Sequence, residues 1–402
     1  MALIGRLIRT LGGTILANTI NVGLVGYKFM GKAHSQGFRD VAFYFPEVKL
    51  KPVMKVLCGR DEAGVKEAQE QFGWQEYELD WRKVLERDDI GVVGIATGNN
   101  VHAGMAIAAA EAGKHVFCEK PLAMNVAEAR SMVDAVKKAG VINMVNFNYR
   151  AVPAIRFARQ MIDEGVLGRI FHWRGLYLQD WIIDPSFPLV WRLDGDLAGS
   201  GSLGDLAAHC IDLAHYLVGD IDELVGMQET FVKRRPKLAA TTGGLTAAGS
   251  DEMGNVTVDD ASMFLARFKN GAVGTFEASR FCAGHRNSNI FEINGEKGSI
   301  RFNVERMNEL EYYDHTDKSD RQGFRVINTT EGAHPWMSAW WPPSHIIGWA
   351  QTFTHQFYEM MNGIADGKNP HPDFEDGLKC QIVLEAVAKS ASEKRWVKLS
   401  EI

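Results

Sequence analysis

Short apolar runs alternate with helical patterns over the first third of the chain, and this alternation limits the fold more than any other feature. Strands are predicted at Asn21–Val25, Pro52–Cys58, Gly91–Ala96, His115–Cys118 and Val141–Asn146. Helices are predicted between them, over Met30–Val41, from Asp61 to Gly73, over Ala103–Ala112 and over Val126–Ala139. Strands that alternate with helices of about 10–15 residues are typical of a doubly wound parallel sheet. We therefore expect a Rossmann-type domain at residues 21–150.

The pattern changes after residue 150. A helix to Glu164 and a strand over Arg169–Gln179 precede a Pro/Trp-rich loop and a helix that carries Asp205. Alternating strands then follow at Ser262–Phe268, Ala272–Arg280, Asn289–Asn294 and Ser299–Val304, and the pair Asn270-Gly271 predicts a hairpin turn. The fold class we expect is α/β, with a C-terminal domain at residues 151–402 built on a large, open, mainly antiparallel sheet.

Three smaller segments complete this outline. Residues 235–256 are interpreted as a loop inserted in the second sheet, and residues 335–349 as a second long loop rich in tryptophan. Helices are expected at about 350–365 and 374–392, and the last of them could pack back on the first domain. Residues 1–20 are apolar but interrupted by Arg6 and Arg9, so we interpret them as an N-terminal extension.

Composition excludes several classes of function. The 402 residues carry a formal net charge of −6 and no basic run, which argues against nucleic acid as a partner. No uninterrupted apolar run reaches the ~18 residues of a membrane span, so no membrane partner is expected. The five cysteines are scattered without C-x-x-C spacing, which favours a reducing compartment. We expect a cytoplasmic protein.

Three ionisable side chains stand at helical spacing in the stretch from residue 203 to 212. Asp205, His209 and Asp212 occupy positions i, i+4 and i+7, so they share one helix face. A carboxylate one turn before an imidazole can hold its tautomer and raise its basicity, as a general base requires. The spacing also fits a buried structural ion pair or a metal site. No second His/Cys cluster accompanies the three, so we expect no metal.

A glycine-containing turn follows the first predicted strand. Gly26 and Gly31 match the outer glycines of a Gly-x-Gly-x-x-Gly turn, and Lys28 replaces the middle one. Such a turn binds a pyrophosphate at the N-terminus of the following helix. After the second strand, Arg60 would suit the extra phosphate of NADP and Asp61 the ribose hydroxyls of NAD. These residues leave the choice of cofactor open.

A lysine stands at the end of the fourth predicted strand, in Glu119-Lys120-Pro121. Ligands bind at this edge of open α/β sheets, and the lysine can donate to a substrate oxygen beside a nicotinamide. An isolated Glu-Lys pair is usually a solvated surface charge, and its place at the strand end favours the functional interpretation.

Four stretches together resemble the glucose-fructose oxidoreductase / inositol dehydrogenase / MocA (Gfo/Idh/MocA) family of NAD(P)-dependent sugar oxidoreductases. They are residues 23–34, 97–102 (Thr-Gly-Asn-Asn-Val-His), 112–121 and 205–209. The resemblance implies NAD as the cofactor, with NADP not excluded, and a homodimer or homotetramer. It also implies that Lys120, Asp205 and His209 are the catalytic residues and that the Lys120–Pro121 bond is cis. The implied cofactor-binding residues are Gly26, Tyr27, Phe29, Met30, Gly31, Gly59, Arg60, Asp61, Thr97, Asn99, His102, Glu119 and Lys120.

Within the family, four further stretches look most like the levoglucosan dehydrogenase type, which oxidises a pyranose hydroxyl at C3 with NAD. They are residues 146–150, 177–181, 191–192 and 341–345. Indole faces stack on the C–H faces of sugars, and Asp, Gln, Asn and Arg pair with hydroxyl groups. We expect the substrate contacts to be Tyr149, Arg150, Asp180, Trp191, Arg192 and His345.

The resemblance implies a mechanism with rivals. His209 would take the hydroxyl proton, Asp205 would orient His209, Lys120 would hydrogen-bond the reacting oxygen, and Asp212 would support them from behind. The first rival is an NAD-dependent glycosidase of the sulfoquinovosidase type, which oxidises C3 transiently, eliminates the aglycone, adds water and is reduced again. The second is a non-catalytic sugar or nucleotide sensor, which the intact set of Lys120, Asp205 and His209 disfavours.

Overall fold

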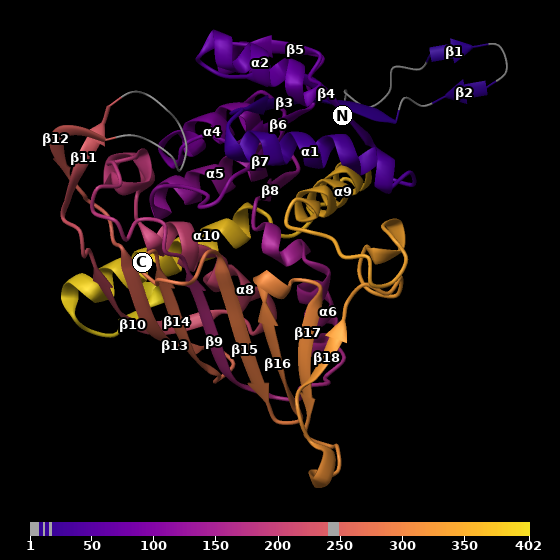
Figure 1. The fold of residues 1–402 in the computed structure, drawn as a ribbon. Coiled ribbons are helices and arrows are strands. Elements are labelled where there is room, and N and C mark those ends of the chain that lie inside the picture. Colours follow the sequence, from indigo (N-terminus) through magenta and orange to yellow (C-terminus); the bar gives the residue numbers. More distant parts are fainter. Residues whose placement is uncertain (1–7, 11–12, 16–17, 240–248) are drawn as a thin grey trace.

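The computed structural model describes residues 8–10, 13–15, 18–239 and 249–402. Two sheets dominate it, and the chain passes from the first to the second after residue 150 (Figure 1). The predicted α/β class is confirmed, with one parallel sheet and one large, mostly antiparallel sheet. Among the described residues, no helix combines the length and the apolar character needed to cross a lipid bilayer.

The first sheet has six parallel strands in the order β5-β4-β3-β6-β7-β8. Its strands are β3 (Thr19–Val25), β4 (Lys51–Cys58), β5 (Glu76–Glu78), β6 (Val92–Ile95), β7 (His115–Cys118) and β8 (Asn143–Val145). Its helices are α1 (Phe29–Tyr44), α2 (Glu62–Phe72), α3 (Trp81–Leu85), α4 (His102–Glu111) and α5 (Val126–Ala139). From β3 the chain adds β4 and β5 on one side and then β6, β7 and β8 on the other, as a doubly wound sheet requires.

Local chemistry sets the ends of the predicted helices. The side chain of Asn125 accepts the N–H of Glu128 at 2.9 Å and so caps α5, which ends at the left-handed Gly140. Gly73 ends α2 in the same way, at the predicted position. The short elements β5 and α3 are additions to the prediction, since they are too brief to show a period.

The second sheet has nine strands in the order β18-β17-β16-β15-β9-β14-β13-β10-β19. The strands, in chain order, are β9 (Ile170–Leu178), β10 (Ile221–Glu229), β13 (Ala261–Phe268), β14 (Val273–Ser279), β15 (Ser288–Gly295), β16 (Gly298–Asn303), β17 (Glu309–Asp314), β18 (Arg325–Asn328) and β19 (Val397–Lys398). Among the described strand pairs of this second sheet, only β9–β14 is parallel. One face is covered by α6 (Pro153–Asp163), α8 (Ala208–Leu217) and α10 (Phe374–Glu393), as Figure 1 shows.

The prediction that residues 235–256 form an inserted loop is partly wrong. Its arms pair as an antiparallel ribbon of β11 (Arg234–Leu238) and β12 (Gly249–Asn255), while residues 240–248 lie outside the described part. Buried Arg235 explains the ordered arm, because its guanidinium donates to the carbonyl oxygens of Asp184 and Ile182. In the predicted N-terminal extension, β1 (Ile8–Thr10) pairs with β2 (Gly13–Ile15).

Two C-terminal helices return to the first sheet. Helix α9 (Gln351–Asp366) packs on α1, where the rings of Phe38 and Phe357 stack at 3.7 Å. The N–H of Phe374, at the start of α10, donates to Asn143 Oδ1 of β8 at 2.8 Å. The first sheet is therefore completed by residues from the far end of the chain.

Candidate active site between the two sheets

A cavity of about 570 Å³ lies between the carboxyl end of the first sheet and one edge of the second domain. From the first sheet it is lined by Phe29, Met30, Thr97, Asn99, Glu119, Lys120 and Pro121. From the remainder of the chain it is lined by Tyr149, Tyr177, Gln179, Trp181, Trp191, Arg192, Asp205, His209, Arg280, Asn287 and Trp349, among others. The three predicted catalytic residues therefore share one pocket.

Lys120 reaches the pocket from the end of β7. Its peptide bond to Pro121 is cis, as predicted. The Lys120 ammonium donates to the backbone oxygen of Asp205 at 2.8 Å and to Asp205 Oδ1 at 3.0 Å. This double contact fixes the lysine across the boundary between the two sheets.

Behind Lys120 lies a buried polar cluster. Glu119 Oε1 contacts His34 Nε2 of α1 at 2.7 Å and also accepts a hydrogen bond from the Asn146 amide. Glu119 Oε2 accepts the backbone N–H of Lys120 at 3.2 Å. The rings of Phe117 and Phe357 enclose the His34 ring, so its contact with Glu119 is shielded from water. The cluster holds the strand end, and with it Lys120, in place.

The helix that carries Asp205 and His209 opens with a wide turn. Residues Leu203–Ala207 are π-helical, and regular α8 begins only at Ala208. Because a π turn holds an extra residue, Asp205 does not lie one regular turn below His209. Its carboxylate instead contacts Lys120 through Oδ1 and Arg280 through Oδ2, the latter at 2.8 Å. Within the described chain no hydrogen bond joins Asp205 to His209, and the orienting role of Asp205 stays a prediction.

The charges around Asp205 keep it ionised. Burial raises the pKa of this carboxyl, but Lys120, Arg280 and Arg192 outweigh burial and hold the pKa well below its usual range. A permanent carboxylate between two cations is a fixed anchor for the Lys120 ammonium.

His209 is a neutral imidazole in this setting. Burial and the nearby Lys120 charge lower its pKa well below the usual value, although Asp205 raises it in part. Its ring packs against Tyr149 at 4.7 Å and Tyr177 at 5.9 Å between centroids. A neutral imidazole beside a cationic lysine can accept a proton from a ligand bound in the pocket.

A chain of polar groups forms the wall beside His209. Tyr177 donates to Asn287 Oδ1 at 2.7 Å, and Gln179 donates to the same oxygen at 2.9 Å. Since the one proton of Tyr177 is used there, Tyr149 must donate in the Tyr149–Tyr177 contact of 2.9 Å. The Tyr149 oxygen in turn accepts the Asn287 amide at 3.5 Å, and Trp181 closes the chain through Gln179.

The glycine turn before α1, next to the cavity residues Phe29 and Met30, is suited to a dinucleotide. Gly26 has a φ of +106°, and a Cβ there would lie 2.3 Å from the Ala96 oxygen, so only glycine fits. No side chain caps the N-terminus of α1, and exposed Lys28 precedes it. The ring of Tyr27 packs over Gly59, and its hydroxyl donates to Asp61 at 3.3 Å. Glycine turn, uncapped helix and carboxylate match what NAD needs for its pyrophosphate and ribose.

Several predicted site residues do not line the cavity. Six of them lie at the glycine turn or after β4, namely Gly26, Tyr27, Gly31, Gly59, Arg60 and Asp61, and four others lie elsewhere. Arg150 is buried in an ion pair with Asp212, away from the cavity lining. Asp180 pairs with Arg286 at 3.3 Å, and His345 is exposed in its loop. His102 is buried against the carbonyl oxygens of Pro121 and Thr97, where it supports the cofactor end without lining it. Each of these four residues was predicted from the motif around it in the sequence, which does not determine where its side chain points.

Other lining residues were not predicted as site residues. Arg280 and Arg286 follow β14, and Asn287 precedes β15, so the sequence showed only strand ends there. Trp349 lies in the tryptophan-rich loop, and its ring stacks on Phe29 of α1 at 5.5 Å. An aromatic-rich loop before a helix was the available signal for Trp349. Trp191, Arg192 and Tyr149 line the cavity as expected.

Fold and site together define an oxidoreductase that holds a dinucleotide on the parallel sheet and its substrate against the second one. The chain belongs to the Gfo/Idh/MocA family. The family model for the NAD-binding Rossmann fold matches residues 20–147, and the model for the family's C-terminal domain matches residues 155–301. The cofactor of this enzyme is therefore NAD.

Individual relatives agree with this assignment. Levoglucosan dehydrogenase of Pseudarthrobacter phenanthrenivorans is 43% identical over 386 residues, which cover 95% of this chain and 99% of the relative. A solved structure of levoglucosan dehydrogenase in complex with NADH and levoglucosan matches with a TM-score of 0.90 and 42% identity, covering 95% and 99% of the two chains. An oxidoreductase domain protein from Kribbella flavida matches with a TM-score of 0.90, 49% identity and the same coverage.

Proposed function

We propose that this enzyme oxidises a ring hydroxyl of a pyranose, at C3, and that levoglucosan is a substrate. The observation that carries the proposal is the convergence of Lys120, Asp205 and His209 in one cavity beside Trp181 and Trp191. Flat indole rings next to polar side chains suit a sugar, which has C–H faces and hydroxyl edges. The sequence motifs and the 43% identity to a levoglucosan dehydrogenase support the choice of sugar and position.

Each catalytic side chain has one task in this proposal. Neutral His209 accepts the proton of the reacting hydroxyl, and the Lys120 ammonium donates a hydrogen bond to the same oxygen. Asp205 fixes Lys120 through the hydrogen bond at its Oδ1. Bound NAD supplies the acceptor for the hydride that leaves the carbinol carbon. Tyr149, which accepts from Asn287 through one lone pair, receives another sugar hydroxyl at its second lone pair.

A redox-neutral glycosidase is the second candidate, and one observation favours it. The residues that line the cavity include Arg192, Arg280 and Arg286, and this basic character suits an anionic substituent on the sugar. In such an enzyme the C3 ketone would acidify the C2 proton, the aglycone would leave, water would add, and the cofactor would return to its starting state.

One experiment separates these candidates. Purified enzyme is mixed with levoglucosan, glucosides, inositols and a sulfoquinovoside, each with NAD and with NADP, while absorbance and chromatography follow the cofactor and the sugar. Reduced NAD that accumulates one-for-one with a keto-sugar supports the dehydrogenase. Aglycone released without net reduction, and only with NAD, establishes the glycosidase. Silence in both channels, with His209→Ala binding sugar like the wild type, identifies a sensor.

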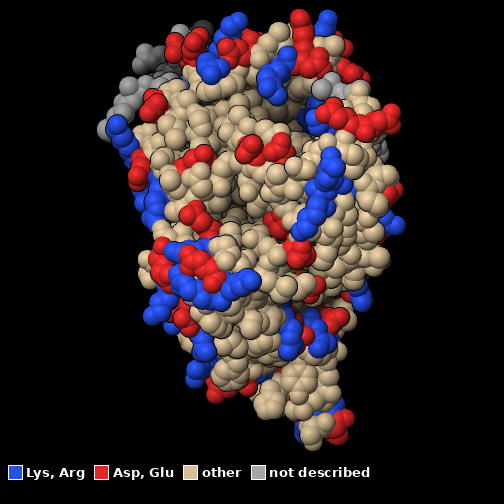
Figure 2. Space-filling view, turned by 90° about the vertical axis from the view of Figure 1, so that its left-hand side faces the viewer, with Lys and Arg blue, Asp and Glu red and all other residues tan. Residues whose placement is uncertain are grey.

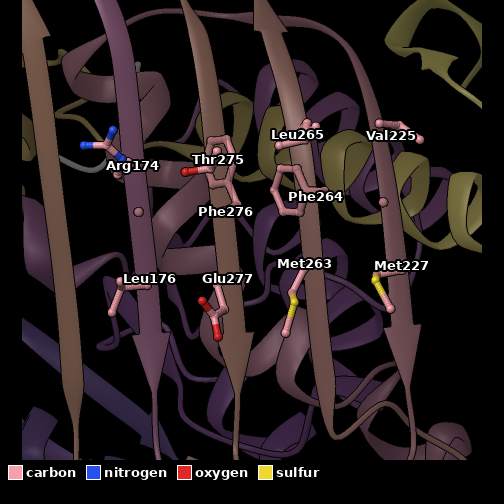
Figure 3. A pocket seen from close by; sticks show the side chains of 12 residues that line it. Arg174, Leu176, Val225, Met227, Met263, Phe264, Leu265, Thr275, Phe276 and Glu277 are labelled. Atoms are coloured by element: carbon pink, nitrogen blue, oxygen red, sulfur yellow. The ribbon is translucent and has the colours of Figure 1, made fainter.

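We also propose that the enzyme is a homo-oligomer that pairs through the open face of the second sheet. Figure 3 shows side chains of this face on β9, β14, β13 and β10. They line an apolar hollow of about 550 Å³. Met227, Met263 and Leu265 are 60%, 41% and 50% exposed there. A patch of this kind on a monomer favours association.

Arg174 of β9 and Glu277 of β14 lie beside the apolar side chains, and Arg174 also pairs with Glu292 at 3.3 Å. In contrast, on the face drawn in Figure 2 acidic and basic side chains are interspersed. Light scattering after size exclusion tests the proposal, and Leu265→Arg should lower the measured mass to that of a smaller assembly. A wild-type monomer would contradict it.

A further inference from the structure

Arg280 joins three parts of the active site from a buried position. It follows β14, and its side chain is 1% exposed. One guanidinium nitrogen donates to Asp205 Oδ2 at 2.8 Å, and another donates to the backbone oxygen of Arg192 at 3.3 Å. Its charge also lies over the Trp181 ring, 5.4 Å from the centroid. The catalytic helix, the substrate loop and the aromatic wall therefore meet at one side chain.

The two oxygens of Asp205 are divided between two cations. Oδ1 accepts from Lys120 and Oδ2 from Arg280, so the three groups form a Lys–Asp–Arg chain with one net positive charge. A carboxylate bound at both oxygens cannot turn toward a third partner without losing one contact. His209, which follows in the same helix, is that third partner.

We propose that Arg280 is a positioning residue for the reaction: it occupies Asp205 Oδ2, and thereby holds Oδ1 on the Lys120 ammonium and keeps the carboxylate away from His209. This inference rests on the proposed function. Packing alone does not account for Arg280, because its Nε is buried with no acceptor in the described part of the chain. Apolar side chains of similar volume replace buried ion pairs without loss of stability in many proteins.

The electrostatic surroundings support the role. The groups that face Asp205 and His209 are Lys120 and Glu119 from the end of β7, Tyr149 from the turn after β8, Tyr177 from β9, Arg192 from the loop after β9, and Arg280 from the end of β14. Arg280 is one of the three cations that lower the Asp205 pKa. Without it, Asp205 is free to approach His209 and stabilise the imidazolium form.

The test compares Arg280→Gln, Arg280→Lys and a control, Arg39→Gln, which replaces an exposed arginine on α1. The pH dependence of kcat/KM is measured between pH 5 and 10 with a sugar that the wild type oxidises. In Arg280→Gln we expect kcat to fall by ~10–10²-fold. The limb on which activity rises with pH should move to higher pH by roughly one unit. Arg280→Lys, which keeps the charge, should restore most of both.

Arg39→Gln should match the wild type in every respect, and NADH binding followed by fluorescence should be unchanged in all variants. A pH profile of Arg280→Gln that superimposes on the wild type, whatever the loss of kcat, would overturn the inference, because a structural role alone does not move the profile.

A second measurement separates this inference from the proposed function. If the wild type oxidises none of the sugars, the proposed function fails, and crystal structures of the variants decide the role of Arg280. In Arg280→Gln we expect Asp205 to rotate away from Lys120, and in Arg280→Lys to keep the contact. An undisturbed Lys120–Asp205 contact in Arg280→Gln overturns the role.

Discussion

Arg150 and Asp212 form a two-point ion pair in the interior of the protein. Arg150 Nε donates to Asp212 Oδ2 at 2.9 Å, and its terminal nitrogen donates to Oδ1 at 2.6 Å. The same nitrogen lies 3.3 Å from Asp376 of α10. This pair ties the turn after β8 to α8 and α10, so a residue expected to contact the substrate belongs to the framework beneath the site.

Asp212→Asn should destabilise the fold while the surviving folded enzyme stays active. The change removes the Asp212 carboxylate and leaves buried Arg150 with Asp376 as its remaining anionic partner. We therefore expect the free energy of unfolding to fall by about 3–5 kcal/mol. Urea unfolding measures it. Asp366→Asn, which breaks the exposed pair with Lys49, is the control and should cost under about 1 kcal/mol. Unchanged stability with a raised KM would return Arg150 to the substrate.

His209→Gln should lower kcat/KM by ~10²–10⁴-fold, because it removes the proton acceptor. Burial and Lys120 lower the His209 pKa, so the basic imidazole persists below the ordinary value of 6.5. The wild-type activity should therefore fall only at pH values below 6.5 as acid is added. A pH profile of kcat/KM with its acidic midpoint above 6.5 would show that another group accepts the proton.

Tyr177→Phe should weaken sugar binding more than NAD binding. The change removes one of the two donors to Asn287 Oδ1 and the acceptor that fixes the Tyr149 hydroxyl. Leaving the buried Tyr149 hydroxyl without this acceptor costs about 1–2 kcal/mol, so we expect KM for the sugar to rise by roughly 5–30-fold. Steady-state kinetics with either reactant varied distinguishes the two effects. Tyr313→Phe on β17 is the matched control, and an equal rise in both KM values would contradict this assignment.

The fold should lose stability in mild acid through His355. This buried histidine accepts the indole N–H of Trp340 at 2.7 Å and donates to the Ala151 oxygen at 2.8 Å, so its neutral form is fully bonded. Burial lowers its pKa to about 4 from 6.5. As pH falls below 6.5 the unfolded chain takes up the proton first, and the free energy of unfolding decreases until about pH 4.

Urea unfolding at pH 7.5 and pH 5 measures the size of this effect. His355 alone should account for about 2 kcal/mol of the difference between the two pH values. In His355→Gln the difference should shrink by that amount, whereas His345→Gln, which changes an exposed histidine, should keep it. An unchanged difference in His355→Gln would contradict the prediction.

The sequence predicted both sheets because each carries a distinct period. The apolar strands of the first sheet are buried on both faces and stand between capped helices, and the second sheet alternates with a period of two. Strand β10 was not predicted, since its run Ile221–Glu229 mixes acidic residues into the apolar side. The arms β11 and β12 were missed because the stretch is rich in glycine, threonine and alanine.

Sequence motifs pointed to the site, whereas helical spacing did not reveal the contacts that Asp205 makes. Lys120, Asp205 and His209 do meet in one cavity. Their contacts differ from the prediction, because the π turn at Leu203–Ala207 leaves no trace in a pattern of i and i+4. Arg280 comes from a strand 75 residues beyond its partner Asp205, and only the register of the second sheet brings the two together.

The return of the C-terminal helices to the first sheet has a practical meaning for protein engineering. The N–H of Val145 in β8 donates to the Pro372 oxygen, and the ring of Phe357 fills the space that Gly37 of α1 leaves open. A cofactor module excised at residue 150 would therefore expose apolar surface on α1 and an unpaired edge on β8. Chimaeras that exchange cofactor preference between relatives should therefore transfer two separate segments of the sequence together: the N-terminal domain and the segment that contains α9 and α10.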